Sequence, residues 1–338
     1  MPASPEMLAA KQALESVLPG IEGVTGIDIG FADEEARDPG ALAVRVFVRD
    51  ASAIPAALSD FIAGLDIPIV VIQRTFEPFA AAFDTGIHRP VVGGVSVGAA
   101  RFVPTGSFPA GTLGAIGRTT STIPPMVIGL SNHHVLAHDG NRAFGDEIIQ
   151  PEPTPFGRLP GDLIGKLLSF EFPEIVFSGI ADAAICSIDL PIVALPTIAD
   201  IGLTAGTTSA FVGMLVRKRG RTTGVTHGIV TTDGSDGLFG TYYPPYTDLP
   251  PVNNPVTNQP TILRELKNQI QVMIDFPQSI VFGEEGDSGS VVVDSTNRIV
   301  GLYFAGGFSA LGDPIRFGLM TPISVVEQAL GISFSLPI

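Results

Sequence analysis

From residue 86 onward, the sequence is a succession of short apolar runs separated by glycine, proline, asparagine and aspartate. Runs such as TLGAIG, PMVIGLSN, LIGKLLSF, SGSVVVD and RIVGLYFAG each have the length of one strand, and about a dozen of them occur in this part of the chain. The 39 glycines and 29 prolines of the chain supply turns and interrupt long helices. The pattern predicts a mainly β domain of the barrel or sandwich type.

Residues 1–85 have a different pattern and predict a separate domain. The expected elements are a helix, two strands, a second helix and a third strand, over residues 5–18, 24–31, 41–50, 52–65 and 68–73. This order predicts a small α/β (α-β-β-α-β) unit with its own core. The acidic stretch ADEEARDPG between the first two strands is interpreted as a solvated loop, because it lacks the ligand spacing of a calcium-binding loop.

The charge and the cysteine content narrow the class of protein. A net charge of −15 disfavours nucleic acid as a partner. The single cysteine, Cys186, cannot form a disulfide within the chain. No apolar run reaches the roughly 18 residues that a membrane span needs, and MPASPEMLAAKQALES lacks the basic and apolar regions of a signal peptide. We therefore expect a cytoplasmic protein that binds neither nucleic acid nor a membrane, although a secreted chain trimmed of its leader has the same pattern.

The stretch EEGDSGSVVVD (284–294) places Ser288 between an aspartate and a glycine, just before an apolar run. Such a sequence is compatible with a plain tight turn or with a nucleophile, which needs a neighbouring base to remove its proton. Histidine is the usual base, and the chain has five: His88, His133, His134, His138 and His227. Three of them lie in the window GLSNHHVLAH. A metal site is disfavoured there, because the window has no carboxylate at the spacing of a helical zinc motif and the cysteine is distant.

The window LSNHHVLA resembles the L-[ST]-x-x-H-[VC] signature of trypsin-like serine proteases, in which His134 takes the place of the base. IADAAICSIDL (180–190) is similar to the aspartate signature of that family and places Asp182 at the start of a short strand. Asp182 follows His134 by 48 residues and Ser288 follows Asp182 by 106, and the family's triad has the same order with intervals of roughly 45 and 90. Three alternatives lie in the same interval: Asp139, which is too close in sequence, Asp146, and Asp189, at the far end of the strand.

The resemblance extends over nearly the whole chain. AGTLGAI (110–116), GDEIIQP (145–151) and GRTTGVTHG (220–228) are similar to segments of uncharacterised trypsin-like bacterial proteins that carry an N-terminal α/β segment. The resemblance implies a chymotrypsin-like peptidase domain over residues 86–338. Its two six-stranded antiparallel β-barrels would cover about 90–195 and 205–325, with the triad in the cleft between them. PISVVEQALG predicts a C-terminal helix over about 322–331.

The same resemblance implies a serine endopeptidase that forms an acyl-enzyme intermediate. Ser288 would attack a peptide or ester carbonyl, His134 would carry the proton, and Asp182 would orient His134. The backbone N–H groups of Gly286 and Ser288 would form the oxyanion hole, while Asp287 would shape the loop. No metal or organic cofactor is required. The implied partner is a protein or peptide substrate, and the oligomeric state stays open.

Substrate-binding residues are implied on two segments. Phe282, six positions before Ser288, corresponds to the base of the primary specificity pocket. Because this residue is not acidic, we expect an apolar or small residue before the cleaved bond, rather than Lys or Arg. The alternative is that Glu284 or Glu285 faces the pocket and supplies the acidic group. Phe304, Ala305 and Gly306 belong to LYFAG (302–306), the strand that pairs with extended substrate in the family.

Some features leave alternatives open. His133 is bulky at a small-residue position of the signature, and Ser290 stands where many relatives have a glycine. RPVVGG (89–94) is similar to an activation cleavage sequence, but the proline after the arginine favours simple continuation into the first barrel. The proline- and tyrosine-rich stretch 241–260 is interpreted as a solvent loop or a recognition loop. A latent partner-binding scaffold and an esterase-like hydrolase are the competing function hypotheses.

Overall fold

The computed structural model forms two compact units, residues 1–80 and 81–338. The boundary that the sequence predicts, near residue 85, falls close to this division. The structure describes residues 4–15, 24–32, 42–48, 50, 52, 56–73, 84–100, 110–137, 143–153, 161–176, 178–232, 241–243, 251–253, 258, 260–261, 264–307 and 317–335.

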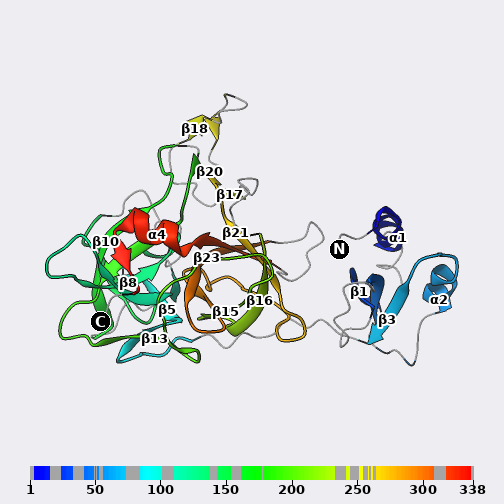
Figure 1. The fold of residues 1–338 in the computed structure, drawn as a ribbon, viewed down its shortest axis with the longest axis horizontal. Helices are drawn as coiled ribbons and strands as arrows, with labels where there is room; N and C mark the ends of the chain where they lie inside the picture. Colours follow the sequence, from blue (N-terminus) through cyan, green and yellow to red (C-terminus); the bar gives the residue numbers. More distant parts are fainter. Residues whose placement is uncertain are drawn as a thin grey trace. The chain divides into compact units, whose positions relative to one another are not determined.

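The first unit is a three-stranded sheet that packs against two helices (Figure 1). Its elements are α1 (Pro5–Glu15), β1 (Val24–Phe31), β2 (Leu42–Val48), α2 (Ala56–Ile62) and β3 (Ile69–Gln73). The central strand β2 is antiparallel to β1 and parallel to β3. Alternate residues of β2, Val44, Val46 and Val48, are buried together with Leu14 of α1 and Leu58 of α2. The period-2 pattern of β2 thus provides the core of this unit.

The second unit begins with a sheet that curls back on itself. Its strands are β5 (Val95–Ala99), β6 (Ala110–Leu113), β7 (Ala115–Thr119), β8 (Val127–Ser131), β9 (Glu147–Ile149), β10 (Leu163–Glu171), β12 (Ala183–Ser187) and β25 (Ile332–Ser333). They lie in the order β25-β7-β8-β12-β10-β9-β5-β6. Only Gly114 separates β6 from β7. This single bent segment therefore pairs with β5 at one end of the sheet, through β6, and with β8 near the other end, through β7. With β6 and β7 taken as one strand and β25 as an addition at the edge, six strands make up this first barrel.

The second barrel is closed. Its strands, in order around the barrel, are β15 (Leu215–Gly220), β16 (Gly224–Thr232), β21 (Ile270–Ile274), β24 (Phe317–Pro322), β23 (Ile299–Gly307) and β22 (Val291–Asp294). Neighbouring strands are antiparallel all the way round. The interior holds apolar side chains such as Val216, Val272 and Val292, with the large rings of Phe282 and Tyr303.

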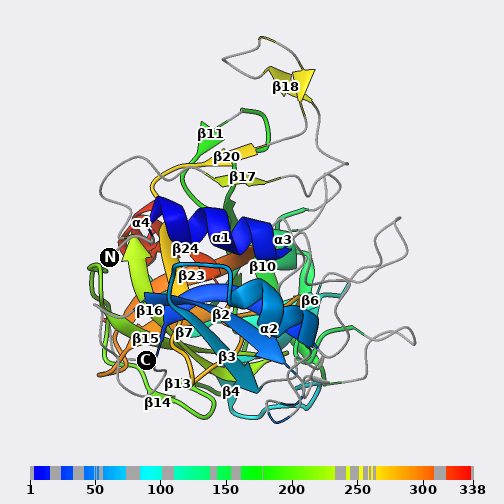
Figure 2. The ribbon, with the colours of Figure 1, turned by 90° about the vertical axis from the view of Figure 1, so that its right-hand side faces the viewer.

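Smaller elements decorate the two barrels. They are β4 (Val91–Gly93), β13 (Ala194–Ile198) and β14 (Gly202–Leu203) in one sheet, β11 (Ser178–Gly179), β17 (Thr241–Tyr243) and β20 (Arg264–Leu266) in a second, and β18 (Val252–Asn253) with β19 (Pro260–Thr261). Figure 2 shows β11, β17 and β20 together at one end of the unit, with β18 beyond them. Much of the 241–260 stretch lies outside the described residues, so its expected loop character stays a prediction.

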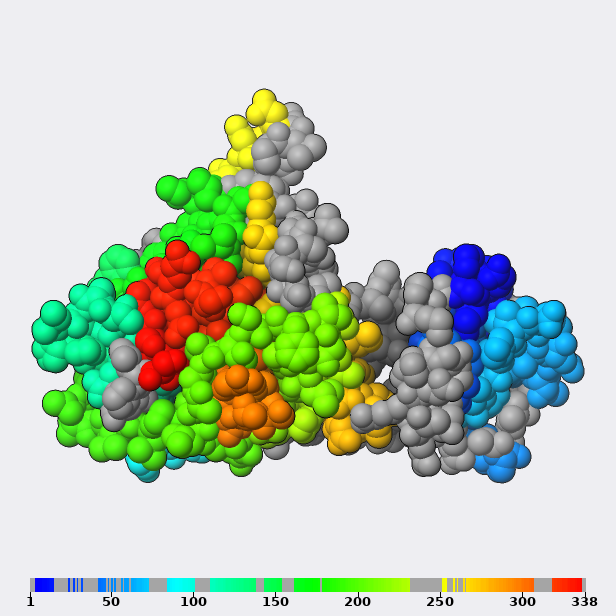
Figure 3. Space-filling model, in the orientation of Figure 1, coloured from blue at the N-terminus to red at the C-terminus, as the bar shows by residue number. Residues whose placement is uncertain are grey.

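One apolar cluster joins the two barrels. It includes Leu130 and Ile185 from the first barrel and Val293 and Leu302 from the second, together with Val326 of helix α4 (Ile323–Leu330). Helix α4 contacts strands of both barrels (Figure 1). In the space-filling view, the C-terminal residues, in red, pack directly against neighbouring parts of the unit (Figure 3). The expected mainly β, two-barrel fold class is confirmed, and α4 occupies the range that the sequence predicts for a C-terminal helix. Within the described residues, no helix is long and apolar enough to cross a membrane.

Candidate active site

His134 lies on a one-turn helix, α3 (His133–Leu136), that follows strand β8 directly. Its Nδ1 is 2.6 Å from Oδ2 of Asp182, and its backbone N–H donates to Oδ1 of the same carboxylate at 3.2 Å. Asp182 immediately precedes β12, which pairs with β8, so the sheet register brings the two residues together. The side chain of Asn132 also donates to the backbone oxygen of Asp182. This pair has the geometry of a carboxylate that orients an imidazole.

The environment of Asp182 keeps its carboxyl group ionised. The side chain has no exposed surface, and burial by itself would raise its pKa. The charge and the hydrogen bond of His134, assisted by His133, outweigh burial and leave the pKa of Asp182 below its usual range. A charged carboxylate is therefore held against one ring nitrogen of His134. The His134 side chain is 17% exposed, so part of the ring is open to solvent.

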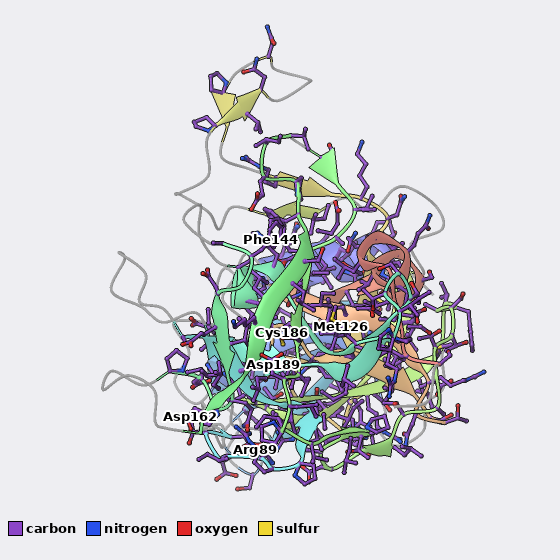
Figure 4. The ribbon with its side chains drawn as sticks, turned by 90° about the vertical axis from the view of Figure 1, so that its left-hand side faces the viewer. Arg89, Met126, Phe144, Asp162, Cys186 and Asp189 are labelled. Atoms are coloured by element: carbon purple, nitrogen blue, oxygen red, sulfur yellow. The ribbon has the colours of Figure 1, made fainter. Side chains whose placement is uncertain are left out.

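His133 is accommodated as a buried aromatic residue. Its ring stacks on Phe172 at 4.8 Å and meets Phe170 edge-on at 5.0 Å. Its Nε2 lies 2.9 Å from Oε1 of Glu174. Phe144 extends the same aromatic group by stacking on Phe170, at the end of β10 opposite Asp162 (Figure 4). The bulky residue at the small-residue position of the signature is thus accommodated by an aromatic and carboxylate pocket beside His134.

Ser288 lies on a loop whose four successive carbonyl oxygens, from residue 285 to residue 288, each accept a hydrogen bond. The donors are Thr222 Oγ1 to Glu285 O (2.8 Å), Thr112 Oγ1 to Gly286 O (2.9 Å), Ser290 N to Asp287 O (3.0 Å) and Thr112 N to Ser288 O (2.8 Å). The Ser288 hydroxyl donates to Phe304 O at 3.2 Å. The main chain around Ser288 is therefore fixed on all sides by neighbouring segments.

The N–H groups of the same loop alternate in their pairing. Those of Asp287 and Gly289 donate to Glu284 O (3.0 Å) and Tyr303 O (2.9 Å). Those of Gly286 and Ser288 have no acceptor among the residues that the structure describes. Gly286 has φ +94°, a left-handed conformation that a residue with a side chain would adopt only with strain. These two N–H groups are available to an anionic oxygen, and their role as an oxyanion hole stays a prediction.

Asp287 is the anchor of this loop. Its carboxylate accepts hydrogen bonds from the N–H groups of Thr222, Thr223 and Glu284 and from the Thr223 hydroxyl. It also lies 2.8 Å from the ammonium of Lys218, and both of these side chains are fully buried. Burial would raise the pKa of Asp287, but Lys218 and the hydrogen bonds hold it below its usual range. The contacts of Asp287 agree with the expected role of this residue in shaping the loop, whereas no sequence motif pointed to Lys218.

The loop that carries Ser288 and the helix α3 that carries His134 meet across strand β6. A Cβ atom added to Gly111 would lie 2.5 Å from Val135 Cγ2, next to His134, and 2.7 Å from Ser288 O. A Cβ atom on Gly114 would lie 2.2 Å from Gly289 O, and one on Gly289 would lie 2.2 Å from Ser131 Oγ. The segments that carry His134, Asp182 and Ser288 therefore converge at the junction of the two barrels. The second unit has a chymotrypsin-like fold.

Comparison with known proteins gives matches among solved structures. No family model and no curated protein matches the chain. Among solved structures, a glutamic-acid-specific serine protease, described as using a histidine triad in substrate binding, is similar with 16% identity and a TM-score of 0.46, covering 72% of this chain and 99% of its own. An alpha-lytic protease homologue, N4, has 16% identity and a TM-score of 0.46 over 72% of this chain and 98% of its own. Thermobifida fusca protease A has 15% identity and a TM-score of 0.44 over 72% and 96%. At these identities the likeness concerns the fold alone.

The expected substrate-binding residues have mixed environments. Phe282 has no exposed surface, and its ring meets Tyr303 at 5.9 Å within the core of the second barrel. Its observed role is core packing, and direct contact with a substrate stays a prediction. Phe304 is also buried and packs with Leu266 of β20, whereas Ala305 is partly exposed. Gly306 pairs with Gly318 of β24, so one edge of this part of β23 is occupied.

Of the three other histidines, the structure describes His88 and His227. His88 lies 3.0 Å from Asp84 Oδ1, His227 belongs to β16, and His138 lies outside the described residues. Among the described residues no group of three or more His, Cys, Asp or Glu side chains could hold a metal ion. Most of the acidic stretch ADEEARDPG also lies outside them.

The segment RPVVGG is held in place as the chain enters the first barrel. Arg89 donates to Gln150 Oε1 at 2.7 Å and to Gly161 O at 2.8 Å. Two residues later, Val91 begins β4 and its N–H donates to Val193 O. Figure 4 shows Arg89 and Asp162 at the same end of β10. Arg89 and Pro90 are nevertheless exposed, and simple continuation of the chain into the first barrel stays a prediction.

Proposed function

We propose that this chain is a serine endopeptidase in which Ser288 is the nucleophile, His134 the general base and Asp182 the group that orients the base. The observation that carries the proposal is the pairing of a buried Asp182 with a partly exposed His134, at a junction where the N–H groups of Gly286 and Ser288 have no acceptor in the described part of the chain. In a turn with a purely structural role, the N–H groups of Gly286 and Ser288 would be expected to have hydrogen-bond acceptors, as most buried backbone donors do.

The proposed chemistry is acyl transfer in two steps. The Ser288 oxygen attacks the substrate carbonyl while His134 takes its proton, and the N–H groups of Gly286 and Ser288 stabilise the negative oxygen that forms. His134 then returns the proton to the leaving amine, and water releases the acyl group by the reverse sequence. In the resting structure the Ser288 hydroxyl donates to Phe304 O at 3.2 Å, a long distance for an O–H donor. Rotation of this weakly held hydroxyl towards His134 is the first step.

The substrate class follows from the packing of Phe282 and Tyr303. A Cβ atom on Gly318 would lie 2.5 Å from Phe282 and 2.9 Å from Tyr303, and one on Gly228 would lie 2.9 Å from Phe282. The two rings therefore fill the space between β16, β23 and β24, where the resemblance places the primary pocket. We propose a small or apolar residue before the cleaved bond, with the substrate backbone extended along residues 304–306. A peptide library with all side chains at that position tests this, and a preference for Arg or Lys would contradict it.

Labelling with a fluorophosphonate probe tests the enzyme proposal directly. Wild type should be labelled, and Ser288→Ala should not, while Ser290→Ala serves as a matched control two residues away. Hydrolysis of casein or of a peptide library by wild type, abolished in Ser288→Ala, identifies an endopeptidase. Turnover of small esters without any peptide cleavage would identify an esterase-like hydrolase instead. Absence of labelling in correctly folded wild type would identify a latent scaffold.

A further inference from the structure

The direction of the Gly286 N–H group depends on one peptide plane, and this inference rests on the proposed function. In a trans peptide the carbonyl of one residue and the N–H of the next point in opposite directions. The N–H of Gly286 shares its peptide with the carbonyl of Glu285. Whatever holds Glu285 O therefore decides where the Gly286 N–H points.

Glu285 O is held by the hydroxyl of Thr222, at 2.8 Å. No other donor to this oxygen is found within the part of the chain that the structure describes. Thr222 is itself 2% exposed and donates its N–H to Asp287 Oδ1 at 3.0 Å. A Cβ atom on Gly286 would lie 2.5 Å from Thr222 Oγ1, so the hydroxyl sits directly against the loop.

The companion peptide is held differently. The N–H of Ser288 shares its peptide with Asp287 O, which accepts from both the N–H and the hydroxyl of Ser290. Loss of the Ser290 hydroxyl leaves the backbone donor in place. The two proposed oxyanion donors thus differ: one peptide is fixed by main chain and side chain, and the other by a single hydroxyl.

We propose that Thr222 is a positioning residue that keeps the Gly286 N–H directed into the oxyanion hole before substrate binds. Without the Thr222 hydroxyl, the Glu285 carbonyl loses the one donor that the described residues supply to it. The Glu285–Gly286 peptide can then rotate, because Gly286 has no side chain to oppose rotation. The N–H would then be absent from the hole for part of the time. A donor that is lost in this way affects the transition state more than substrate binding, since the oxyanion exists only after attack.

The test compares the loss of the Thr222 hydroxyl with the loss of a threonine hydroxyl that lies away from the proposed oxyanion hole. In Thr222→Val the hydroxyl is replaced by a methyl group of similar size, and in Thr222→Ser it is kept. The control is Thr204→Val, because Thr204 also donates its hydroxyl to a backbone carbonyl, Pro196 O at 3.0 Å, on the edge of the first barrel. The substrate is the best peptide ester found for wild type, and thermal unfolding of each variant is measured alongside.

We expect kcat to fall about 10- to 100-fold in Thr222→Val with KM nearly unchanged. This is less than the roughly 10²- to 10³-fold loss that follows complete removal of one oxyanion donor, because the Gly286 N–H would be misdirected for only part of the time. A peptide aldehyde that mimics the tetrahedral intermediate should bind more weakly by a similar factor. Thr222→Ser should recover most of the activity, and Ser290→Ala should change kcat far less than Thr222→Val. If Thr222→Val does not fold, a Thr222→Ser variant with wild-type kcat, together with Thr222→Ala at least tenfold slower, gives the same support.

Two outcomes would overturn the inference. Equal kcat values for Thr222→Val and Thr204→Val would show that the hydroxyl does not position the donor. A rise in KM without a fall in kcat would show a role in substrate binding instead. Failure of the proposed function gives a different result, because wild type itself would then neither react with the fluorophosphonate nor cleave the ester.

Discussion

The ammonium of Lys218 lies 2.8 Å from the carboxylate of Asp287, and neither side chain has any exposed surface. Lys218 also faces the rings of Phe282 and Tyr303, at 5.6 and 5.2 Å from their centres. The pair thus joins Lys218, inside the second barrel, to Asp287, the residue just before Ser288. The loop that carries Ser288 is therefore anchored by a buried positive charge on strand β15.

Lys218→Met should destabilise the protein by about 3–5 kcal/mol, because it leaves the Asp287 carboxylate buried without a counter-charge. Activity should fall as well, since the loop loses its anchor. Urea unfolding at pH 7 measures the change. Lys166→Met, at an exposed position of β10, is the control and should alter stability by less than about 0.5 kcal/mol. Equal effects of the two substitutions would contradict the anchoring role.

Acid should destabilise the protein through Asp182 and Asp287. Both carboxyl groups have a folded-state pKa below the usual range. A lowered pKa contributes stability that is complete above the unfolded-state pKa, about 3.9, and is lost as pH falls through the folded-state value. Chemical unfolding between pH 6 and pH 3 should show this loss beginning near pH 4. Asp182→Asn should have a flatter pH dependence, and an unchanged slope would count against the assignment.

The local sequence motifs predicted His134, Asp182 and Ser288, because each lies in a short segment with a recognisable pattern. Lys218 was not found for a physical reason. In LVRKRG three basic residues follow one another, and this pattern suggests a solvated strand. Only the closed barrel turns Val216 and Lys218 inward while Arg217 faces out, and the partner Asp287 is 69 residues away. The pairing of Lys218 with Asp287 depends on closure of the barrel, and a local sequence pattern does not predict that closure.

Two other features illustrate the same limit. The sequence marks Phe282 as a pocket residue by its spacing from Ser288, but its packing against Tyr303 depends on room left by glycines on β16 and β24. Thr222 lies in the recognised segment GRTTG, yet its hydrogen bond to Glu285 O joins residues 63 positions apart. Contacts of this kind follow from the tertiary fold, whereas the motifs identify the residues that carry the chemistry.

Asp182→Asn should lower kcat by about 10⁴-fold while leaving the fold intact, by analogy with the same change in the serine protease triad. The amide cannot accept the Nδ1 proton of His134 in the way the carboxylate does, so the wrong tautomer of the imidazole is favoured. Ester hydrolysis and near-ultraviolet circular dichroism check activity and fold together. Asp189→Asn, at the other end of the same short segment, is the control, and a comparable loss there would contradict the assignment of Asp182.

Glu174→Ala should weaken the support behind the base. Arg264, a fully buried residue of β20, donates to Pro173 O and Glu174 O, both at 2.7 Å, and so holds the turn from which Glu174 reaches His133. Loss of the carboxylate should cost about 1–3 kcal/mol, the usual effect of removing a partner from a buried polar group. It should also lower kcat, because His133 and His134 share one helical turn.

Glu174→Gln is the matched variant for this support, because it keeps an acceptor at the same position and should retain more stability and activity than Glu174→Ala. Glu171→Ala, a partly exposed residue of β10, is the control and should change stability by less than about 0.5 kcal/mol. Urea unfolding and ester hydrolysis measure the three variants. If Glu174→Ala loses stability but keeps the wild-type kcat, the aromatic and carboxylate pocket stabilises the first barrel without positioning His134.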